Sequence, residues 1–261
     1  MASAVILGAG NVATNLAPAL LKAGIDILQI YSRTETSASV LAAKVNAVFC
    51  TDPDKINDSA HYYFYALKDS AIAEVLNYTG KFKGIHVHTA GSVGLEVFEG
   101  KAEQYGILYP LQTFSKEKET DFSKVPLFIE GKNRDTEALL MTIAQSLSEK
   151  TYYANSAQRA QLHLAAVFAC NFSNLLYDIA SEIVDDTIGG FDVLKPLISE
   201  TAEKVQILSP RKAQTGPATR YDTEIIDKHI AMLAQQPELA GLYEQMSKMI
   251  YQRRISSDEK I

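Results

Sequence analysis

The segment from Ala4 to Thr34 constrains the fold of this chain most strongly, because an apolar run, a glycine-rich turn, a helical stretch and a second apolar run follow one another. The run Ala-Val-Ile-Leu at residues 4–7 predicts a buried strand, and the Gly-Ala-Gly-Asn-Val-Ala that follows matches the pattern G-x-G-x-x-G/A. Gly8 permits the tight turn, Gly10 lets the backbone approach a pyrophosphate, and Ala13 lets the helix pack closely on the strand. Together these features predict a dinucleotide-binding βαβ unit, in which free N–H groups of the first helical turn face the phosphates.

The residues at the end of the second apolar run indicate which dinucleotide is bound. Ile25–Ile30 is the predicted strand, and a site that prefers NAD usually has Asp or Glu at its end to hold the ribose 2′-OH. Here Tyr-Ser-Arg-Thr follows, so Arg33 can pair with a 2′-phosphate and the hydroxyls of Ser32 and Thr34 can assist. This favours NADP(H) over NAD(H), unless Arg33 is only a solvated loop arginine. The predicted cofactor-binding residues are Gly8, Gly10, Asn11, Val12, Ser32, Arg33, Thr34, Leu67, Lys68 and Thr89.

The alternation of strands and helices continues along the N-terminal part of the chain. Further strands are predicted at residues 47–50, 61–67, 84–88, 106–109 and 125–130, with a solvated loop at 115–124 and an amphipathic helix at 135–148. This pattern predicts an α/β Rossmann domain with a doubly wound, mainly parallel sheet. Ligands of such sheets bind outside the carboxyl ends of the strands, where Lys68, Ser92 and Gln112 are expected to lie.

The composition changes after Tyr153, where an all-α C-terminal domain is predicted. Residues 156–186 contain no glycine or proline and would form one helix about 45 Å long at 1.5 Å per residue. Its apolar positions cover more than one stripe, which predicts burial against partners and a homodimer formed through this domain. Further helices are predicted at residues 191–206, 222–235 and 237–254. The predicted domains are therefore an NADP-binding Rossmann domain, 1–153, and a helical substrate and dimerisation domain, 154–261.

The overall composition is that of a soluble protein, because 47% of the residues are hydrophobic and 21% are charged. A formal net charge of −6 at pH 7 argues against nucleic acid as a partner, and no basic run contradicts this. Cys50 and Cys170 have neither metal-ligand spacing nor a disulfide framework. No signal peptide is visible, and no apolar run reaches the roughly 18 residues of a membrane span. We therefore expect a cytoplasmic protein without a metal site, a nucleic-acid partner or a membrane segment.

A set of polar side chains lies on the predicted long helix. At about 100° per residue, His163, Asn171, Asn174 and Asp178 fall on one face of an otherwise apolar helix. Such groups are costly to bury unless they find hydrogen-bond partners. A substrate cleft would supply those partners, and so would contacts between helices, for example at a dimer interface. The cleft is the favoured explanation, and the alternative remains open.

Hydride transfer is accompanied by a proton, and histidine is suited to transfer it near neutral pH. His88 stands at a strand end and is expected to open onto the following loop, while His163 lies on the polar face of the helix. Asn171 could orient a substrate oxygen or the nicotinamide amide. Arg220 could bind an anionic substrate group or pair with Asp222. The predicted catalytic residues are His88, His163 and Asn171, and the predicted substrate-binding residues are Ser92, Gln112, Asn174, Thr215 and Arg220.

The order of these motifs resembles that of bacterial Rossmann-like proteins with a C-terminal domain of unknown function. The matching segments extend over nearly the whole chain and are residues 8–13, 32–34, 68–69, 88–92, 110–114, 163–174 and 215–222. The architecture is similar to that of 6-phosphogluconate dehydrogenase, pyrroline-5-carboxylate reductase, ketopantoate reductase and the NADP oxidoreductases that use a deazaflavin coenzyme. The resemblance implies an NADP-dependent oxidoreductase.

Two residues depart from the patterns that the resemblance implies. In hydroxyacid dehydrogenases of this superfamily, a lysine four residues before an asparagine of the long helix acts as acid or base. Here the residue four positions before Asn171 is Val167. Tyr109 stands where the family has a histidine before its Pro-Leu-Gln-Thr-Phe segment. The first hypothesis is an NADP-dependent reductase or dehydrogenase of a small carbonyl, hydroxy or imine substrate bound in a cleft between the domains. The alternatives are a non-catalytic NADP-binding regulatory module and a protein whose helical domain binds a partner.

Overall fold

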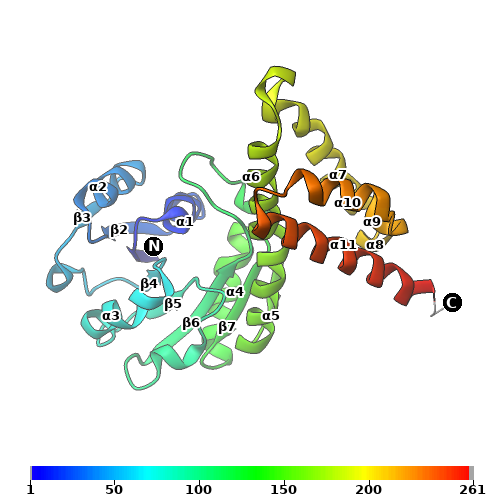
Figure 1. The fold of residues 1–261 in the computed structure, drawn as a ribbon. Helices are drawn as coiled ribbons and strands as arrows, with labels where there is room; N and C mark the ends of the chain where they lie inside the picture. The colour runs from blue at the N-terminus through cyan, green and yellow to red at the C-terminus, as the bar shows by residue number, and fades with distance from the viewer. Residues whose placement is uncertain (1, 259–261) are drawn as a thin grey trace. The chain divides into compact units, whose positions relative to one another are not determined.

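Eight strands form one sheet in the N-terminal part of the chain (Figure 1). The computed structural model describes residues 2–258, and its strands are β1 (Ser3–Leu7), β2 (Asp26–Tyr31), β3 (Val48–Cys50), β4 (Tyr62–Tyr65), β5 (Ile85–His88), β6 (Gln104–Pro110), β7 (Leu127–Gly131) and β8 (Thr151–Tyr153). Their order is β3-β2-β1-β4-β5-β6-β7-β8, and every neighbouring pair is parallel except β6 with β7. The strand order reverses at β1, where sheets of this kind bind dinucleotides. The predicted doubly wound, mainly parallel sheet is confirmed.

Alternate residues of β1 pack into two separate cores, one on each face of the sheet. The covering helices are α1 (Asn11–Lys22), α2 (Glu35–Lys44), α3 (Asp69–Thr79) and α4 (Arg134–Leu147). Ala4 and Ile6 lie in the core with residues of α1, α2 and α4. Val5 and Leu7 lie in the other core, with residues of α3. Because both faces are covered, all of β1 is buried, which explains why its sequence is a continuous apolar run.

Two parts of this region differ from the sequence prediction. The sequence does not predict β8, because only three residues pair there, in parallel with β7. The segment 115–124 is not wholly solvated: Phe122 lies in a short 3-10 turn, is buried, and stacks on Phe114 with ring centres 5.6 Å apart. These two buried rings fix the charged segment at both ends.

The predicted long helix is confirmed, with its end at Ile183. It consists of α5 (Ser156–Ala166), a π-helical segment (Val167–Phe172) and α6 (Ser173–Ile183). Leu164, Phe168 and Phe172 of this helix are exposed in the single chain. By length and composition the helix is apolar enough to cross a membrane, although the sequence predicts no membrane segment. Core helices of soluble proteins pass the same test.

Contacts within the chain divide it into two compact units, Met1–Leu175 and Leu176–Ile261. The second unit is helical, as predicted. Besides the end of α6 and two 3-10 turns (Asp186–Ile188 and Gly190–Leu194), it contains α7 (Lys195–Ile207), α8 (Pro210–Ala213), α9 (Pro217–Arg220), α10 (Thr223–Met232) and α11 (Pro237–Asp258). Helix α11 packs against α9 and α10. Helices α7, α10 and α11 correspond to the three predicted helices, whereas the short α8 and α9 are not predicted from the sequence.

Candidate cofactor and proton-transfer site

A cavity of about 300 Å³ lies where β1, β2 and β4 end, at the carboxyl edge of the sheet. Six of the predicted cofactor-binding residues line it, namely Gly8, Gly10, Ser32, Arg33, Leu67 and Lys68. Helix α3 forms a further wall, and Lys116, from the loop between β6 and β7, contributes another side chain. The fold therefore brings together three strand ends that are far apart in the sequence.

The glycine-rich turn has the geometry that a bound pyrophosphate requires. Gly8 has φ = +120°, and a Cβ there would lie 2.2 Å from the carbonyl oxygen of Ala66. A Cβ at Gly10 would meet no atom within 4 Å, so the space in front of this residue is open. No side chain caps the N-terminus of α1, so that its first N–H groups are available to an anion. These residues fit the phosphates of a dinucleotide.

Four predicted cofactor-binding residues are not among those that line the cavity: Asn11, Val12, Thr34 and Thr89. The side-chain amide of Asn11 donates to the carbonyl oxygen of Phe114, at 2.9 Å. Thr89 is buried, and its hydroxyl donates to the carbonyl oxygen of Tyr65. The polar side chains of Asn11 and Thr89 therefore bind the protein's own backbone.

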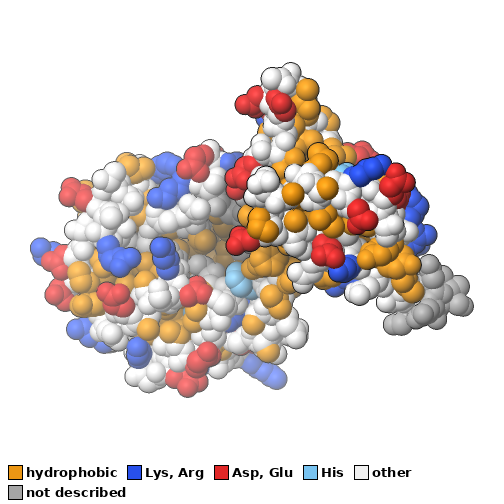
Figure 2. All heavy atoms as spheres, viewed as in Figure 1, with side chains coloured by type: hydrophobic (Ala, Val, Ile, Leu, Met, Phe, Trp, Pro, Cys, Tyr) orange, Lys and Arg blue, Asp and Glu red, His pale blue; other side chains and the backbone are white. Residues whose placement is uncertain are grey.

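The charges around the cavity are mainly positive. Arg33, Lys68 and Lys116 line it without forming an ion pair in the described part of the chain, residues 2–258, and Glu74 of α3 lies among them. Burial raises the pKa of Tyr31, which also lines the cavity; Glu74 adds to this shift and Arg33 opposes it. On the face that Figure 2 shows, basic and acidic side chains are interspersed over the first unit. The cavity thus has a local excess of positive charge.

A tyrosine and a histidine meet near the carboxyl ends of β5 and β6. The hydroxyl of Tyr109 and Nδ1 of His163 share a hydrogen bond of 3.2 Å, and the two rings meet edge to face. Gly91 permits this approach, because a Cβ there would lie 2.8 Å from the His163 ring and 2.9 Å from the Tyr109 ring. His163 is partly exposed, while burial raises the pKa of Tyr109. The residue that departs from the family pattern, Tyr109, is thus the partner of a predicted catalytic residue.

A buried ion pair joins α5, the helix that contains His163, to β7. Arg159 of α5 is 1% exposed and pairs with Glu130 of β7 at 2.5 Å. It also donates to the carbonyl oxygen of Val93, and Glu130 accepts hydrogen bonds from both the backbone N–H and the hydroxyl of Ser156. The sequence does not predict this pair, because its members lie on separate elements and neither belongs to a motif.

His88 does not open onto the loop, and this expectation is wrong. Its side chain is fully buried and stacks on Phe98 with ring centres 5.5 Å apart. Alternate residues of a strand point to the same face, so His88 follows His86 into the core. Burial, together with the nearby Arg159 cation, lowers the pKa of His88 to about 3.

The hydrogen bonds of His88 agree with a neutral, structural ring. Its Nδ1 accepts from the backbone N–H of Ala90 at 3.2 Å. Its Nε2 has no hydrogen-bond partner within residues 2–258. The ring is therefore held as a neutral group and does not line the cofactor cavity.

The polar set on the long helix does not lie on a regular α-helix. The π-helical segment, whose hydrogen bonds run from i to i+5, lies between His163 and Asn174 and includes Asn171. Angles calculated at 100° per residue do not apply across it, so the predicted common face has no support. Asn171, Asn174 and Asp178 are exposed, and their side chains form no hydrogen bonds with the described residues. Within the described residues, internal hydrogen bonding therefore accounts for His163, which bonds to Tyr109, but not for the other three.

The remaining predicted substrate residues lie in different places. Ser92 donates to Asp69, and Gln112 is exposed and accepts from the backbone N–H of Thr113. Thr215 and Arg220 are exposed residues of the second unit, where Asp222 caps α10 and forms no ion pair with Arg220 within residues 2–258. In the same described part of the chain, no group of three or more His, Cys, Asp or Glu side chains could hold a metal ion.

Comparisons with known families and structures agree with this architecture. Residues 3–87 match the family described as NADP oxidoreductase, coenzyme F420-dependent, and residues 125–250 match a domain of unknown function, DUF2520. A candidate NADP oxidoreductase from Bacteroides fragilis is 49% identical, with a TM-score of 0.92 over 96% of this chain and 98% of that one.

More distant structures share the fold. A pyrroline-5-carboxylate reductase from Coxiella burnetii has 15% identity and a TM-score of 0.57, over 97% of each chain. An imine reductase from Streptomyces aurantiacus has 16% identity and a TM-score of 0.63, over 95% of each chain. Among curated proteins no sequence matches this chain. The first family and the Bacteroides protein together indicate a nicotinamide-type cofactor.

Proposed function

This chain belongs to the family that joins an NADP oxidoreductase domain of the coenzyme F420-dependent type to a DUF2520 domain, and from that premise we propose that it is an NADP(H)-dependent reductase of a small carbonyl or imine compound. The main support is the cavity at β1, where the open space before Gly10 lies beside Arg33 and Lys68. The imine class of substrate is suggested by the names of two fold relatives.

The preference for NADP(H) rests on the end of β2. The strand is followed by Ser32 and Arg33 on the cavity wall, without a carboxylate to hold a ribose 2′-OH. An arginine at this position can pair with a phosphate dianion through two parallel hydrogen bonds. The turn around Gly8 and Gly10 would hold the pyrophosphate of the same cofactor.

Reduction of a C=O or C=N bond adds a hydride to carbon, which bound NADPH would supply, and a proton to oxygen or nitrogen. His163 is the proposed proton donor, because it is partly exposed and already hydrogen-bonded to Tyr109. Tyr109 is a positioning residue: its hydroxyl fixes the ring through Nδ1 and leaves Nε2 for a substrate. In this proposal His163 replaces the lysine of related dehydrogenases, whose position is occupied by Val167.

The exposed apolar residues of the long helix support a homodimer. Leu164, Phe168 and Phe172 recur at every fourth residue, and the two phenylalanine rings pack edge to face 4.9 Å apart. Exposed apolar surface of this kind is usually covered by a protein partner or by lipid. We infer a second copy of the chain as the partner, in a cytoplasmic protein.

A second candidate function is an NADP-binding module without turnover. It is favoured by Val167 in place of a lysine and by the burial of His88, which leaves His163 alone of the two histidines predicted to transfer a proton. The two functions differ in one measurable property, substrate-dependent oxidation of NADPH.

The test is NADPH oxidation, followed by absorbance, with a panel of small carbonyl and cyclic imine compounds. The reductase predicts turnover that His163→Asn reduces at least a hundredfold. His229→Asn is the matched control, because His229 contacts Tyr243 in the same edge-to-face way in the second unit. Binding of NADPH without turnover of any compound would favour the regulatory module.

A further inference from the structure

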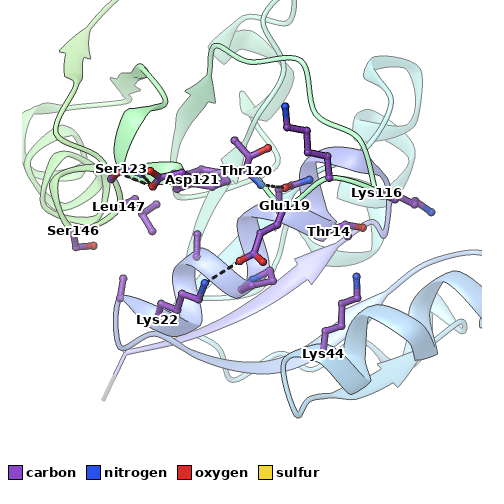
Figure 3. Close-up of a pocket in the computed structure, with 16 residues that line it drawn as sticks. Thr14, Lys22, Lys44, Lys116, Glu119, Thr120, Asp121, Ser123, Ser146 and Leu147 are labelled. Carbon is purple, nitrogen blue, oxygen red and sulfur yellow. Dashed lines mark hydrogen bonds and ion pairs between the residues drawn. The ribbon is translucent and has the colours of Figure 1, made fainter.

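Lys116 lines three neighbouring cavities of the first unit. The first is the cofactor cavity, and the second, of about 290 Å³, lies between the glycine-rich turn and α2. The third is a groove of about 780 Å³ between α1, the loop after β6 and the end of α4 (Figure 3). Ala9 and Ser37 line both of the smaller cavities, as Lys116 does. Lys116 therefore borders the space between the glycine-rich turn and α2.

The loop that contains Lys116 is tied to α1 by asparagine side chains. Asn11 donates to the carbonyl oxygen of Phe114, and Asn15 donates to that of Ser115, each at 2.9 Å. The buried Asn15 also accepts from the backbone N–H of Thr120, at 3.1 Å. The backbone is thus fixed on both sides of Lys116, whose side chain remains exposed.

The lysines of this region differ in whether they have a partner. Lys22 pairs with Glu119 at 3.0 Å, at one end of the groove in Figure 3. Lys44 and Lys116 lie at the other end, near Thr14, and form no ion pair in the part of the chain that the structure describes. Lys118, on the same loop, is also unpaired within residues 2–258 and lines the large groove, so Lys44 and Lys116 are the unpaired lysines beside the glycine-rich turn and α2.

We propose that Lys116 binds the 2′-phosphate of NADP(H) together with Arg33, as a specificity-determining residue from outside the βαβ unit. The ribose 2′ position lies at the end of β2, where Ser32, Arg33 and Ser37 line the same cavity as Lys116. The cavity of about 290 Å³ is also lined by Lys116. Apart from Ala9 and Thr14, its other lining residues all belong to α2, which begins two residues after Arg33. A phosphate monoester with nearly two negative charges favours more than one cation.

This inference rests on the proposed function, so the test measures binding rather than turnover. Wild-type protein, Lys116→Ala and Lys118→Ala are titrated with NADPH and with NADH, and adenosine 2′,5′-bisphosphate and adenosine 5′-monophosphate serve as competing probes. Lys118 is the matched control, because it lies on the same loop, is exposed, and lines only the large groove. Thermal melting checks that the variants remain folded.

The inference predicts that Lys116→Ala weakens NADPH and the bisphosphate about tenfold and NADH and the monophosphate less than twofold, with Lys118→Ala unchanged. Equal weakening of NADPH and NADH would place Lys116 at the pyrophosphate and overturn the inference. Unchanged NADPH binding in Lys116→Ala would also overturn it, while leaving the proposed function intact. If the wild type binds neither nucleotide, both proposals are wrong.

Discussion

The polar groups at the end of β1 and those at the ends of β5 and β6 are used in opposite ways. Around the cofactor cavity, Arg33 and Lys68 are exposed and unpaired in the described chain, and the glycine-rich turn faces open space. In the second region, Arg159 of α5 is paired with Glu130 of β7 inside the protein, and His88 of β5 is stacked on Phe98. The first region keeps its binding capacity for a ligand, whereas the second uses its polar groups to hold one partly exposed histidine, His163, in place.

The largest expected effects distinguish the structural role of Gly8 from the binding role of Gly10 in the glycine-rich turn. Gly8→Ala should destabilise the protein by about 5 kcal/mol, because the new Cβ meets the Ala66 carbonyl at a positive φ. Gly10→Ala should leave stability unchanged and abolish NADPH binding, because its Cβ enters only the open space. Urea unfolding and nucleotide titration measure the two effects. A stable Gly8→Ala, or a Gly10→Ala that binds normally, would contradict this geometry.

The next effect tests whether the buried ion pair between α5 and β7 stabilises the fold more than an exposed ion pair does. Glu130→Ala should cost about 3 kcal/mol of unfolding free energy, because it leaves the Arg159 charge buried without its partner. Glu119→Ala breaks the exposed pair with Lys22 and should cost less than about 1 kcal/mol. Similar losses in the two variants, measured by urea unfolding, would mean that the buried pair has no special role.

The buried His88 should make the stability depend on pH. In the unfolded chain a histidine titrates near 6.5, and in the folded protein the pKa of His88 is about 3. Below pH 6.5 the unfolded state therefore binds the extra proton, so stability falls as pH decreases from 6.5 toward 3. When the pH is lowered from 7.5 to 5.0, the unfolding free energy of the wild type should fall by about 2 kcal/mol more than that of His88→Leu. If urea unfolding shows the same loss in the wild type and in His88→Leu, the ring takes up its proton in the folded protein as readily as in the unfolded chain, which would contradict the burial argument.

The smallest effect concerns the positioning of His163. Tyr109→Phe removes the hydrogen bond to Nδ1 and keeps the ring, which should lower kcat about fivefold, the value of one hydrogen bond, with little change in NADPH affinity. The comparison of kcat with cofactor affinity separates positioning from general destabilisation. If NADPH affinity fell in parallel, Tyr109 would be supporting the whole domain.

The cofactor region could be predicted from the sequence because its determinants are local. The turn at Gly8 and Gly10 and the end of β2 at Arg33 lie within one βαβ unit, where spacing fixes geometry. Lys116 could not be found in this way, since it reaches the cavity through hydrogen bonds of Asn11 and Asn15 to a loop about a hundred residues away. A charged loop has no sequence period that distinguishes such a lysine from a solvated one.

The region of Tyr109 and His163 was less predictable because its contacts are tertiary. The expectation for His88 was wrong because it relied on the strand end and neglected the alternation that also buries His86. The common face of His163 and Asn174 assumed a regular α-helix, which a π-helical segment interrupts without a visible sequence signal. The pairing of Tyr109 with His163 joins two elements that only the fold brings together.

The most direct test of the account is a fluorescence titration of wild-type protein and Arg33→Asp with NADPH and with NADH. The account predicts that the wild type binds NADPH at least tenfold more tightly than NADH. The substituted carboxylate should weaken NADPH about a hundredfold and leave NADH nearly unchanged, because it repels only the nucleotide with a 2′-phosphate. Equal weakening of both nucleotides, or no binding of either by the wild type, would contradict the assignment of this cavity to NADP(H).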